Sequence, residues 1–166
     1  REHKHGVLKL RSKGVSSGFH VSLAVNIEKY LYGLAEMPSN WNVKALEAQA
    51  LVGRSYAVYQ YLKQNIPSEK TNIDAGISSS RKSYCWCHIG STASSQYYYG
   101  YLKEIAGPNW VQAVNNTAGK VITYDGGYTQ SNVIQAFYSS STGGKTNDNA
   151  VGFGSSTPWP YLKTVD

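Results

Sequence analysis

A chain of 166 residues, 41% of them hydrophobic and 16% charged, has the composition of one globular domain and not of a disordered protein. Its formal net charge of +6 favours anionic partners, but the basic residues are scattered from Arg1 to Lys163, which argues against nucleic acid as a partner. No apolar run approaches the roughly 18 residues that cross a bilayer, so the sequence predicts no membrane span. We expect residues 1–166 to form a single domain, with residues 1–6 as a flexible start.

Two short strands are the first predicted elements. Within residues 7–25, "VLKLRS" and "FHVSLAV" flank the turn-like stretch "KGVSSG", which is typical of a β-hairpin. From Asn26, a residue suited to capping, apolar residues recur at helical spacing. Pro38 biases Met37 away from helical backbone, so this helix is predicted to end near Glu36.

A second helix is predicted from residues 40–42 to about Leu62. The small residues Ala50, Gly53 and Ala57 lie on it, and such a stripe lets another element pack closely, at a cost of about 1 kcal/mol for the glycine. The polar stretch that follows, 64–83, has no sustained period and is predicted to be an irregular surface loop.

The rest of the chain predicts one more helix and a hairpin. "PNWVQAVNNTAGK" has Pro108 near its first turn and Gly119 just beyond its end, as a helix does. "KVITYDGGYTQSNVIQAFYSS" indicates a β-hairpin that turns at Asp125 and Gly126, and a Gly/Ser-rich loop region follows. Strands, then helices, then strands indicate an α+β fold.

Cysteine chemistry is one candidate for function. The chain contains no Walker loop, GxSxG elbow or HExxH motif, so the commonest phosphate, hydrolase and zinc-protease sites lack their residues. Cys85, Cys87 and His88 in "YCWCHIG" could supply three zinc ligands, whereas a structural site needs four. A local disulfide, two free thiols, or a cysteine nucleophile paired with a histidine are the alternatives.

Glu36 is the second candidate. It follows a predicted helix, between the apolar residues Leu34 and Met37. An apolar setting favours the protonated carboxyl that a general acid needs. Alternatively, Glu36 lies on the surface or binds a backbone N–H.

A second catalytic carboxylate is not evident in the sequence. Glycosidases ordinarily use two carboxylates about 5 to 9.5 Å apart. Glu28 precedes Glu36 by eight residues, which is roughly 12 Å along a helix, and Glu47 shares a charged face with Lys44. If Glu36 acts on a sugar, we therefore expect it to act alone.

Five segments, in order, carry a resemblance to a known family. "YLYGLAEMPSNWNVKALEAQALVGRSYA", "SQYYYG", "AVNNTAGKVITYDG", "AFYSSSTGGKT" and "PYLKTVD" resemble the motifs of the stage II sporulation protein D and amidase enhancer family. The resemblance extends from about Val7 to Asp166. It implies an α+β fold with N-terminal strands, two adjacent helices that carry the "EMP" and "AQA" motifs, and a further helix and hairpins that form a glycan groove.

The resemblance also implies an activity and a site. It implies a peptidoglycan lytic transglycosylase that cleaves the bond between N-acetylmuramic acid and N-acetylglucosamine in peptide-stripped glycan and leaves 1,6-anhydro ends. Glu36 matches the catalytic glutamate. The positions that match segments expected to bind substrate are Arg54, Gln96, Tyr98, Tyr138, Ser139, Ser140, Ser141, Gly143, Gly144 and Thr146. Gln49 and Arg54 are expected to brace the site more than to react.

The remaining expectations follow from the same family. No cofactor is required; some members bind zinc through Cys and His just before the glutamine, where this chain has Ser94 and Ser95. The expected partners are peptidoglycan glycan strands and a cell-wall amidase, with no nucleic acid. The expected location is extracytoplasmic, at the cell wall or cell surface, or in the space around the engulfed forespore if the host sporulates. A non-catalytic, peptidoglycan-binding amidase enhancer is the alternative function.

Overall fold

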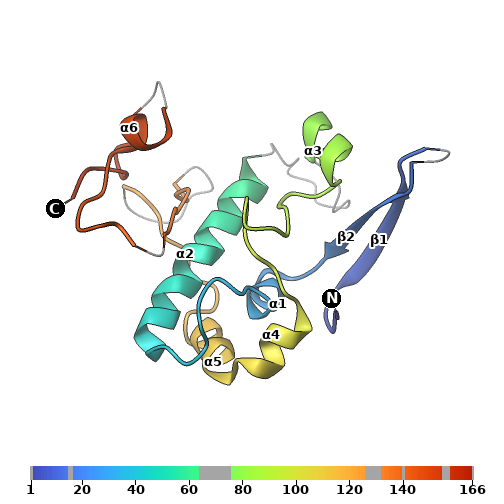
Figure 1. Cartoon of the computed structure of the whole chain (residues 1–166), viewed down its shortest axis with the longest axis horizontal. Helices are drawn as coiled ribbons and strands as arrows, with labels where there is room; N and C mark the ends of the chain where they lie inside the picture. The colour runs from blue at the N-terminus through green and yellow to red at the C-terminus, as the bar shows by residue number, and fades with distance from the viewer. Residues whose placement is uncertain are drawn as a thin grey trace.

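The computed structural model describes residues 2–14, 17–63, 76–125, 132–139, 141–154 and 158–165. In these ranges the fold is mixed, with one antiparallel pair of strands and six helices (Figure 1). The elements in chain order are β1 (Val7–Ser12), β2 (Phe19–Ala24), α1 (Ile27–Tyr32), α2 (Val43–Leu62), α3 (Ser79–Tyr84), α4 (Tyr101–Ala106), α5 (Pro108–Asn116) and α6 (Asn149–Phe153).

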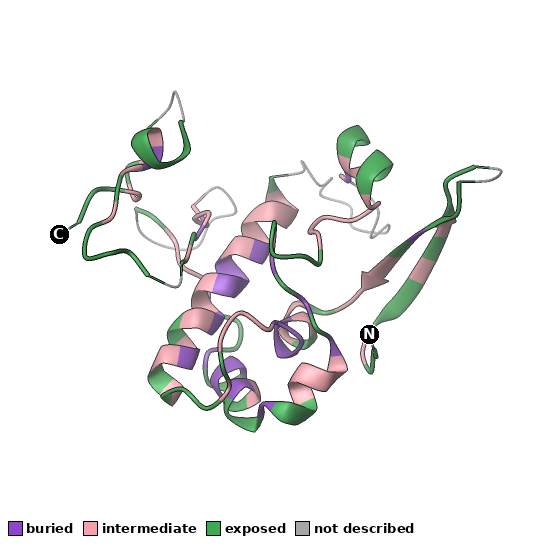
Figure 2. Ribbon diagram, viewed as in Figure 1, coloured by how far each residue is buried: buried purple, intermediate pink, exposed green. Residues whose placement is uncertain are grey.

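The N-terminal hairpin is confirmed. Strands β1 and β2 pair in antiparallel register, with Val7 opposite Ala24 and Ser12 opposite Phe19. The pair projects away from the helices (Figure 1), and most of its residues are exposed or half-buried (Figure 2). The hairpin therefore contributes little to the core of the described chain.

Helix α1 begins as predicted but ends earlier. The side chain of Asn26 accepts a hydrogen bond from the Glu28 N–H at 2.9 Å, which confirms the predicted cap. The helix ends at Tyr32 and not near Glu36, because the backbone at Gly33 and Leu34 leaves the helix to pair with residues 98–100. Tertiary pairing, and not Pro38, sets this helix end.

Helices α1, α2 and α5 enclose the core. Both long helices form where the sequence predicts them: Asn42 caps α2, and Pro108 opens α5. The indole N–H of Trp110 donates to the Leu31 carbonyl at 2.8 Å and so satisfies a group at the end of α1. Figure 2 shows the buried residues on the facing sides of these helices. The core residues are Leu31, Tyr32, Leu34, Leu46, Ala50, Tyr98, Trp110, Ala113 and Val114.

A buried ion pair joins the same helices. Arg54 is only 1% exposed, and its guanidinium donates to both carboxylate oxygens of Glu28, with the shortest bond at 2.7 Å. The same guanidinium also donates to the carbonyls of Val114 and Lys120, and Glu28 accepts from the Gly119 N–H. Arg54 thus ties α2 to α1 and to the end of α5.

Other segments differ from the predictions. Two helices lie in stretches predicted as loop, since α3 occupies the end of 64–83 and α6 lies in the Gly/Ser-rich region; α4 was not predicted. Tertiary contact and side-chain caps stabilise such short helices more than periodicity does. Of the second predicted hairpin, the described residues form one antiparallel bridge, between Thr123 and Val133. Its predicted Gly126 turn lies outside the described residues.

The first described residues contact α4, and the flexibility of residues 1–6 stays a prediction. The carbonyl of Glu2 accepts from the Tyr101 N–H at 2.9 Å, and His5 Nε2 lies 2.8 Å from the Glu104 carboxylate. Residues 2–5 therefore rest on α4. Among the described residues, no helix has the length and apolarity that crossing a membrane requires.

Replacement of Gly33 by alanine is expected to destabilise the fold. A Cβ at Gly33 would overlap the ring of Tyr98 and lie 3.0 Å from the Gly100 Cα, and overpacking of this kind costs about 1–3 kcal/mol. Urea unfolding measures this cost. The matched control is Gly152→Ala, where the nearest atom is 4.0 Å from the new Cβ; equal stability of the two variants would contradict the prediction.

Removal of the Arg54 guanidinium is expected to lower the free energy of unfolding more than Gly33→Ala does. In Arg54→Met the Glu28 carboxylate loses its cation while partly buried, and breaking a buried pair in this way costs about 3–5 kcal/mol. The double variant Arg54→Met with Glu28→Gln removes the uncompensated charge and should recover part of this loss in thermal unfolding. A double variant that is less stable than Arg54→Met would contradict this account.

Candidate active site

Glu36 lies on the connection between α1 and α2, and hydrogen bonds fix this connection at both ends. The Ala35 N–H donates to the Tyr97 carbonyl at 2.9 Å. On the other side, Lys103 Nζ of α4 donates to the Met37 carbonyl and to Ser39 Oγ, each at 2.7 Å. Burial lowers the pKa of Lys103. Glu36 is half-buried and lies on a segment that hydrogen bonds fix on both sides.

The two carboxylate oxygens of Glu36 have different surroundings. Oε1 accepts a hydrogen bond from the Tyr97 N–H at 2.6 Å and another from the Tyr138 hydroxyl at 3.1 Å. No described residue donates a hydrogen bond to Oε2. One oxygen is thus held by the protein, and the other accepts no hydrogen bond from the described residues.

A buried chain of hydrogen bonds positions the Tyr138 hydroxyl. The Gln96 side chain has no exposed area; its Nε2 donates to Tyr138 Oη at 3.3 Å and to the Gly53 carbonyl at 3.0 Å. Its Oε1 accepts from the Tyr30 hydroxyl at 3.0 Å. Burial raises the pKa of Tyr138, and the Glu36 carboxylate adds to this effect. Burial likewise raises the pKa of Tyr30, so both phenols keep their protons and act as donors.

Three of the predicted substrate-binding residues are internal. Arg54 lies in the ion pair described above and Gln96 supports Tyr138, so neither is open to a ligand. Tyr98 is buried, with its ring stacked on Tyr30 at a centroid distance of 5.2 Å. Gln49, expected to brace the site, is half-buried, and its Nε2 has no hydrogen-bond partner in the described part of the chain.

The predicted Ser/Gly segment directly follows Tyr138. Ser139 Oγ donates to the Ser141 carbonyl, and the Gly143 N–H donates to Ser141 Oγ. Gly143 and Gly144 both have positive φ. The Thr146 hydroxyl forms hydrogen bonds with the backbone of residues 163 and 165. Ser140 lies outside the described residues.

Two tyrosines beside Glu36 were missed by the sequence analysis. Tyr97 and Tyr99 are 39% and 42% exposed, and their rings lie 6.4 Å apart in a stacked arrangement. Tyr98 between them points inward, as alternation along an extended segment requires. That alternation in "YYY" is the signal that could have identified the two exposed rings. Tyr97 also provides the backbone N–H that binds Glu36.

Four other carboxylates of the described chain bind other groups. Glu28 pairs with Arg54, Glu47 with Lys44 and Asn116, and Glu104 with His5 and Lys4. Asp148 caps α6 through the Val151 N–H. This agrees with the inference that Glu28 and Glu47 do not partner Glu36.

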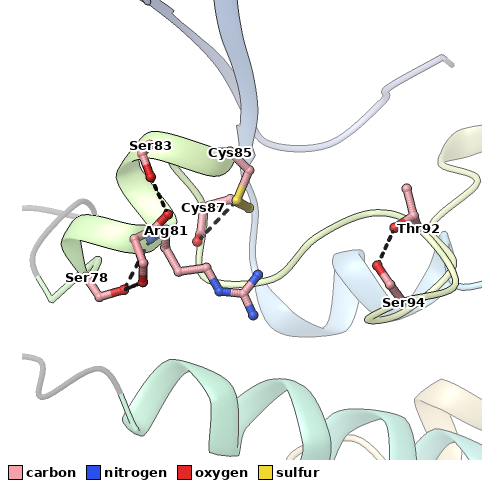
Figure 3. The surroundings of a disulfide bond; sticks show 8 residues. Ser78, Arg81, Ser83, Cys85, Cys87, Thr92 and Ser94 are labelled. Atoms are coloured by element: carbon pink, nitrogen blue, oxygen red, sulfur yellow. Dashed lines mark hydrogen bonds between the residues drawn. A yellow bond between two sulfur atoms is a disulfide. The ribbon is translucent and has the colours of Figure 1, made fainter.

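The two cysteines that the sequence offers as candidate zinc ligands are joined to each other. Cys85 and Cys87 form a disulfide just after α3 (Figure 3), so neither sulfur is a thiolate while the bond is intact. Within the described ranges, no three His, Cys, Asp or Glu residues gather in a metal-binding group. The donor set that includes His88 therefore does not fit a zinc ion.

Comparison with known proteins agrees with the motifs. The chain is 31% identical over 139 residues to an uncharacterized protein of Brachyspira hyodysenteriae, covering 81% of this chain and 31% of that protein. It is also 31% identical over 128 residues to a Bacillus subtilis protein named amidase enhancer, covering 77% of this chain and 14% of that protein. The chain thus spans less than a third of the length of either relative. The family described as stage II sporulation protein, SpoIID, matches residues 16–124, and the chain belongs to this family.

Proposed function

We propose that this chain is the catalytic domain of a peptidoglycan lytic transglycosylase and that Glu36 is its acid and base. The observation that carries the proposal is the asymmetry of the Glu36 carboxyl group, with Oε1 held by Tyr97 and Tyr138 and Oε2 without a donor among the described residues. A general acid needs a positioned oxygen that can reach the substrate, and this asymmetry supports that role for Oε2.

The first step is protonation of the leaving group. The proton on Oε2 of Glu36 passes to the glycosidic oxygen between N-acetylmuramic acid and N-acetylglucosamine as the bond from that oxygen to the muramic C1 breaks. Positive charge develops on the muramic ring and negative charge on Glu36. The Tyr97 N–H and the Tyr138 hydroxyl already point at Oε1, so they stabilise the carboxylate without reorganisation.

The second step needs no further carboxylate. Glu36, now ionised, accepts the proton of the muramic 6-hydroxyl as that oxygen attacks C1, and a 1,6-anhydro ring closes. The acid is thereby regenerated, and no water is consumed. The engagement of Glu28, Glu47 and Glu104 with other groups fits a reaction in which the sugar supplies its own nucleophile.

The proposed substrate and setting follow from the same chemistry. The exposed rings of Tyr97 and Tyr99 offer apolar faces to sugar rings, and the Ser/Gly segment after Tyr138 offers hydroxyl and backbone groups. We therefore assign peptide-stripped glycan strands as the substrate, with no cofactor in either step. The place of action would be extracytoplasmic, at the cell wall. The net charge of +6 suits a polyanionic wall.

One observation favours a second function. The Bacillus subtilis relative is named amidase enhancer, so the same surface could hold glycan for a separate cell-wall amidase without cutting it. In that case Glu36 would hydrogen-bond sugar hydroxyls through Oε2 and would transfer no proton.

Substitution of Glu36 by glutamine separates the two functions. With peptide-free glycan strands, the wild type is expected to release fragments with 1,6-anhydro ends, detectable by mass spectrometry. Glu36→Gln should lower the rate at least about 100-fold, because general acid–base catalysis contributes about 10²- to 10⁴-fold.

The chemical form of the product ends tests the mechanism, in addition to the reaction rate. Ordinary reducing ends would mean that water is the nucleophile and would overturn the intramolecular step. Glycan that binds to both proteins and is cut by neither would favour the enhancer function. A Glu36→Gln variant as active as the wild type would remove Glu36 from the mechanism.

Removal of the Tyr138 hydroxyl tests the support of Oε1. A hydrogen bond to a charged group contributes about 1.5–3 kcal/mol, so Tyr138→Phe should lower kcat/KM roughly 10- to 100-fold. The effect should fall on kcat more than on KM, since the charge on Glu36 develops during the reaction. Tyr84→Phe, in the exposed part of α3, is the matched control. Equal rates for the two variants would contradict the assigned role.

A further inference from the structure

A pocket of about 370 Å³ lies beside the C-terminal half of α2. Some of its lining residues belong to the motif segments, but none is among the expected substrate-binding positions. Besides Val133, four aromatic and two polar side chains line it, and we call this set the aromatic pocket: Tyr59, Tyr124, Trp159, Tyr161, Asp125 and Asn132.

The rings of the aromatic pocket form a continuous series. Trp159 lies 6.3 Å from Tyr59 and 5.7 Å from Tyr161, and Tyr161 lies 5.7 Å from Tyr124, all between centroids. The backbone N–H of Trp159 donates to the side-chain oxygen of the buried Asn149 at 2.6 Å. This contact fixes the main chain at Trp159, and the ring contacts above place its indole among the other rings.

The polar groups indicate a ligand that donates hydrogen bonds. No described residue donates a hydrogen bond to the Asp125 carboxylate or forms an ion pair with it. Burial raises the pKa of Tyr59 and of Tyr161, so both phenols stay neutral. Aromatic faces for C–H groups, together with a carboxylate and an amide for hydroxyls, suit a sugar ring. The Asp125 carboxylate, which no described residue pairs, disfavours an anionic ligand.

The aromatic pocket is connected to the Glu36 site through Phe137. Tyr138 donates to Glu36, and the ring of the preceding residue, Phe137, stacks on Trp159 at 6.2 Å. Phe137 also meets Tyr56 of α2 at 6.4 Å. The consecutive residues Phe137 and Tyr138 therefore contact the aromatic pocket and Glu36, respectively.

We infer that the aromatic pocket binds a neutral N-acetylhexosamine unit of the same glycan strand that is cut at Glu36. This inference rests on the proposed function and deepens it. It assigns the pocket to N-acetylglucosamine, because Asp125 would repel the lactyl carboxylate of a peptide-free muramic acid. A glycan strand would then be bound at two places, the aromatic pocket and the Glu36 site.

The test uses neutral N-acetylglucosamine oligomers of two and six units, with affinity measured by isothermal titration calorimetry. All proteins carry Glu36→Gln, so that cleavage does not interfere. The six-unit oligomer should bind more tightly than the two-unit oligomer. Tyr124→Ala should remove most of this gain, lowering affinity for the longer oligomer roughly 2- to 10-fold, the scale of one aromatic contact. Tyr124 is 41% exposed, so its truncation should leave the fold intact.

Two further variants complete the experiment. Trp159→Ala should reproduce the loss, and Tyr84→Ala, with an exposed ring on α3, should leave both affinities unchanged. If Tyr124→Ala and Trp159→Ala bind the six-unit oligomer as tightly as their parent, the pocket assignment is overturned. Transglycosylase activity of the wild-type chain on glycan strands is measured separately, so the proposed function can stand when the pocket assignment fails.

Discussion

The buried amide of Gln96 is the interaction on which the Glu36 site depends. Its three hydrogen bonds reach Tyr30 on α1, Gly53 on α2 and Tyr138 near the C-terminal region. A buried amide that loses a partner costs about 1–3 kcal/mol, so the three parts of the chain are held in one arrangement. Because the Tyr138 hydroxyl also binds Glu36, the position of the carboxyl group depends on the contacts of the Gln96 side chain.

Of the two glycines beside this arrangement, Gly33 is sterically required, because a Cβ there would overlap the ring of Tyr98. A Cβ at Gly53 would lie 3.5 Å from Gln96 Nε2 and 3.4 Å from a Leu34 methyl. These are ordinary van der Waals distances, so α2 has room for an alanine at this position. The packing of Leu34 and Gln96 therefore does not explain the helix propensity that Gly53 gives up, about 1 kcal/mol.

Local signals in the sequence predict those parts of the fold that local chemistry decides. The capping residue Asn26, the first-turn Pro108 and the alternation of the first strands all correspond to observed elements. The end of α1 and the existence of α4 could not be predicted in this way, because pairing with residues far along the chain decides them. For the site, the motifs contain both Glu36 and Tyr138, which the structure joins by a hydrogen bond, and their roles stay predictions. A motif does not show which of its residues are exposed, so it could not show that Arg54 and Tyr98, expected among the substrate-binding residues, are buried.

The charge distribution around Glu36 bears on how one carboxyl group could serve both steps. Its two donors are neutral, a backbone N–H and a phenol, and none of the described cations forms an ion pair with it. Cations of α2 and α4 bind other groups, since Arg54 binds Glu28 and Lys103 binds the backbone beyond Glu36. A cation in contact would favour the carboxylate throughout the reaction, and a wholly apolar pocket would favour the acid throughout. Neutral donors on one oxygen allow both forms to be held in the same geometry, which is what a group that gives a proton and then takes one back requires.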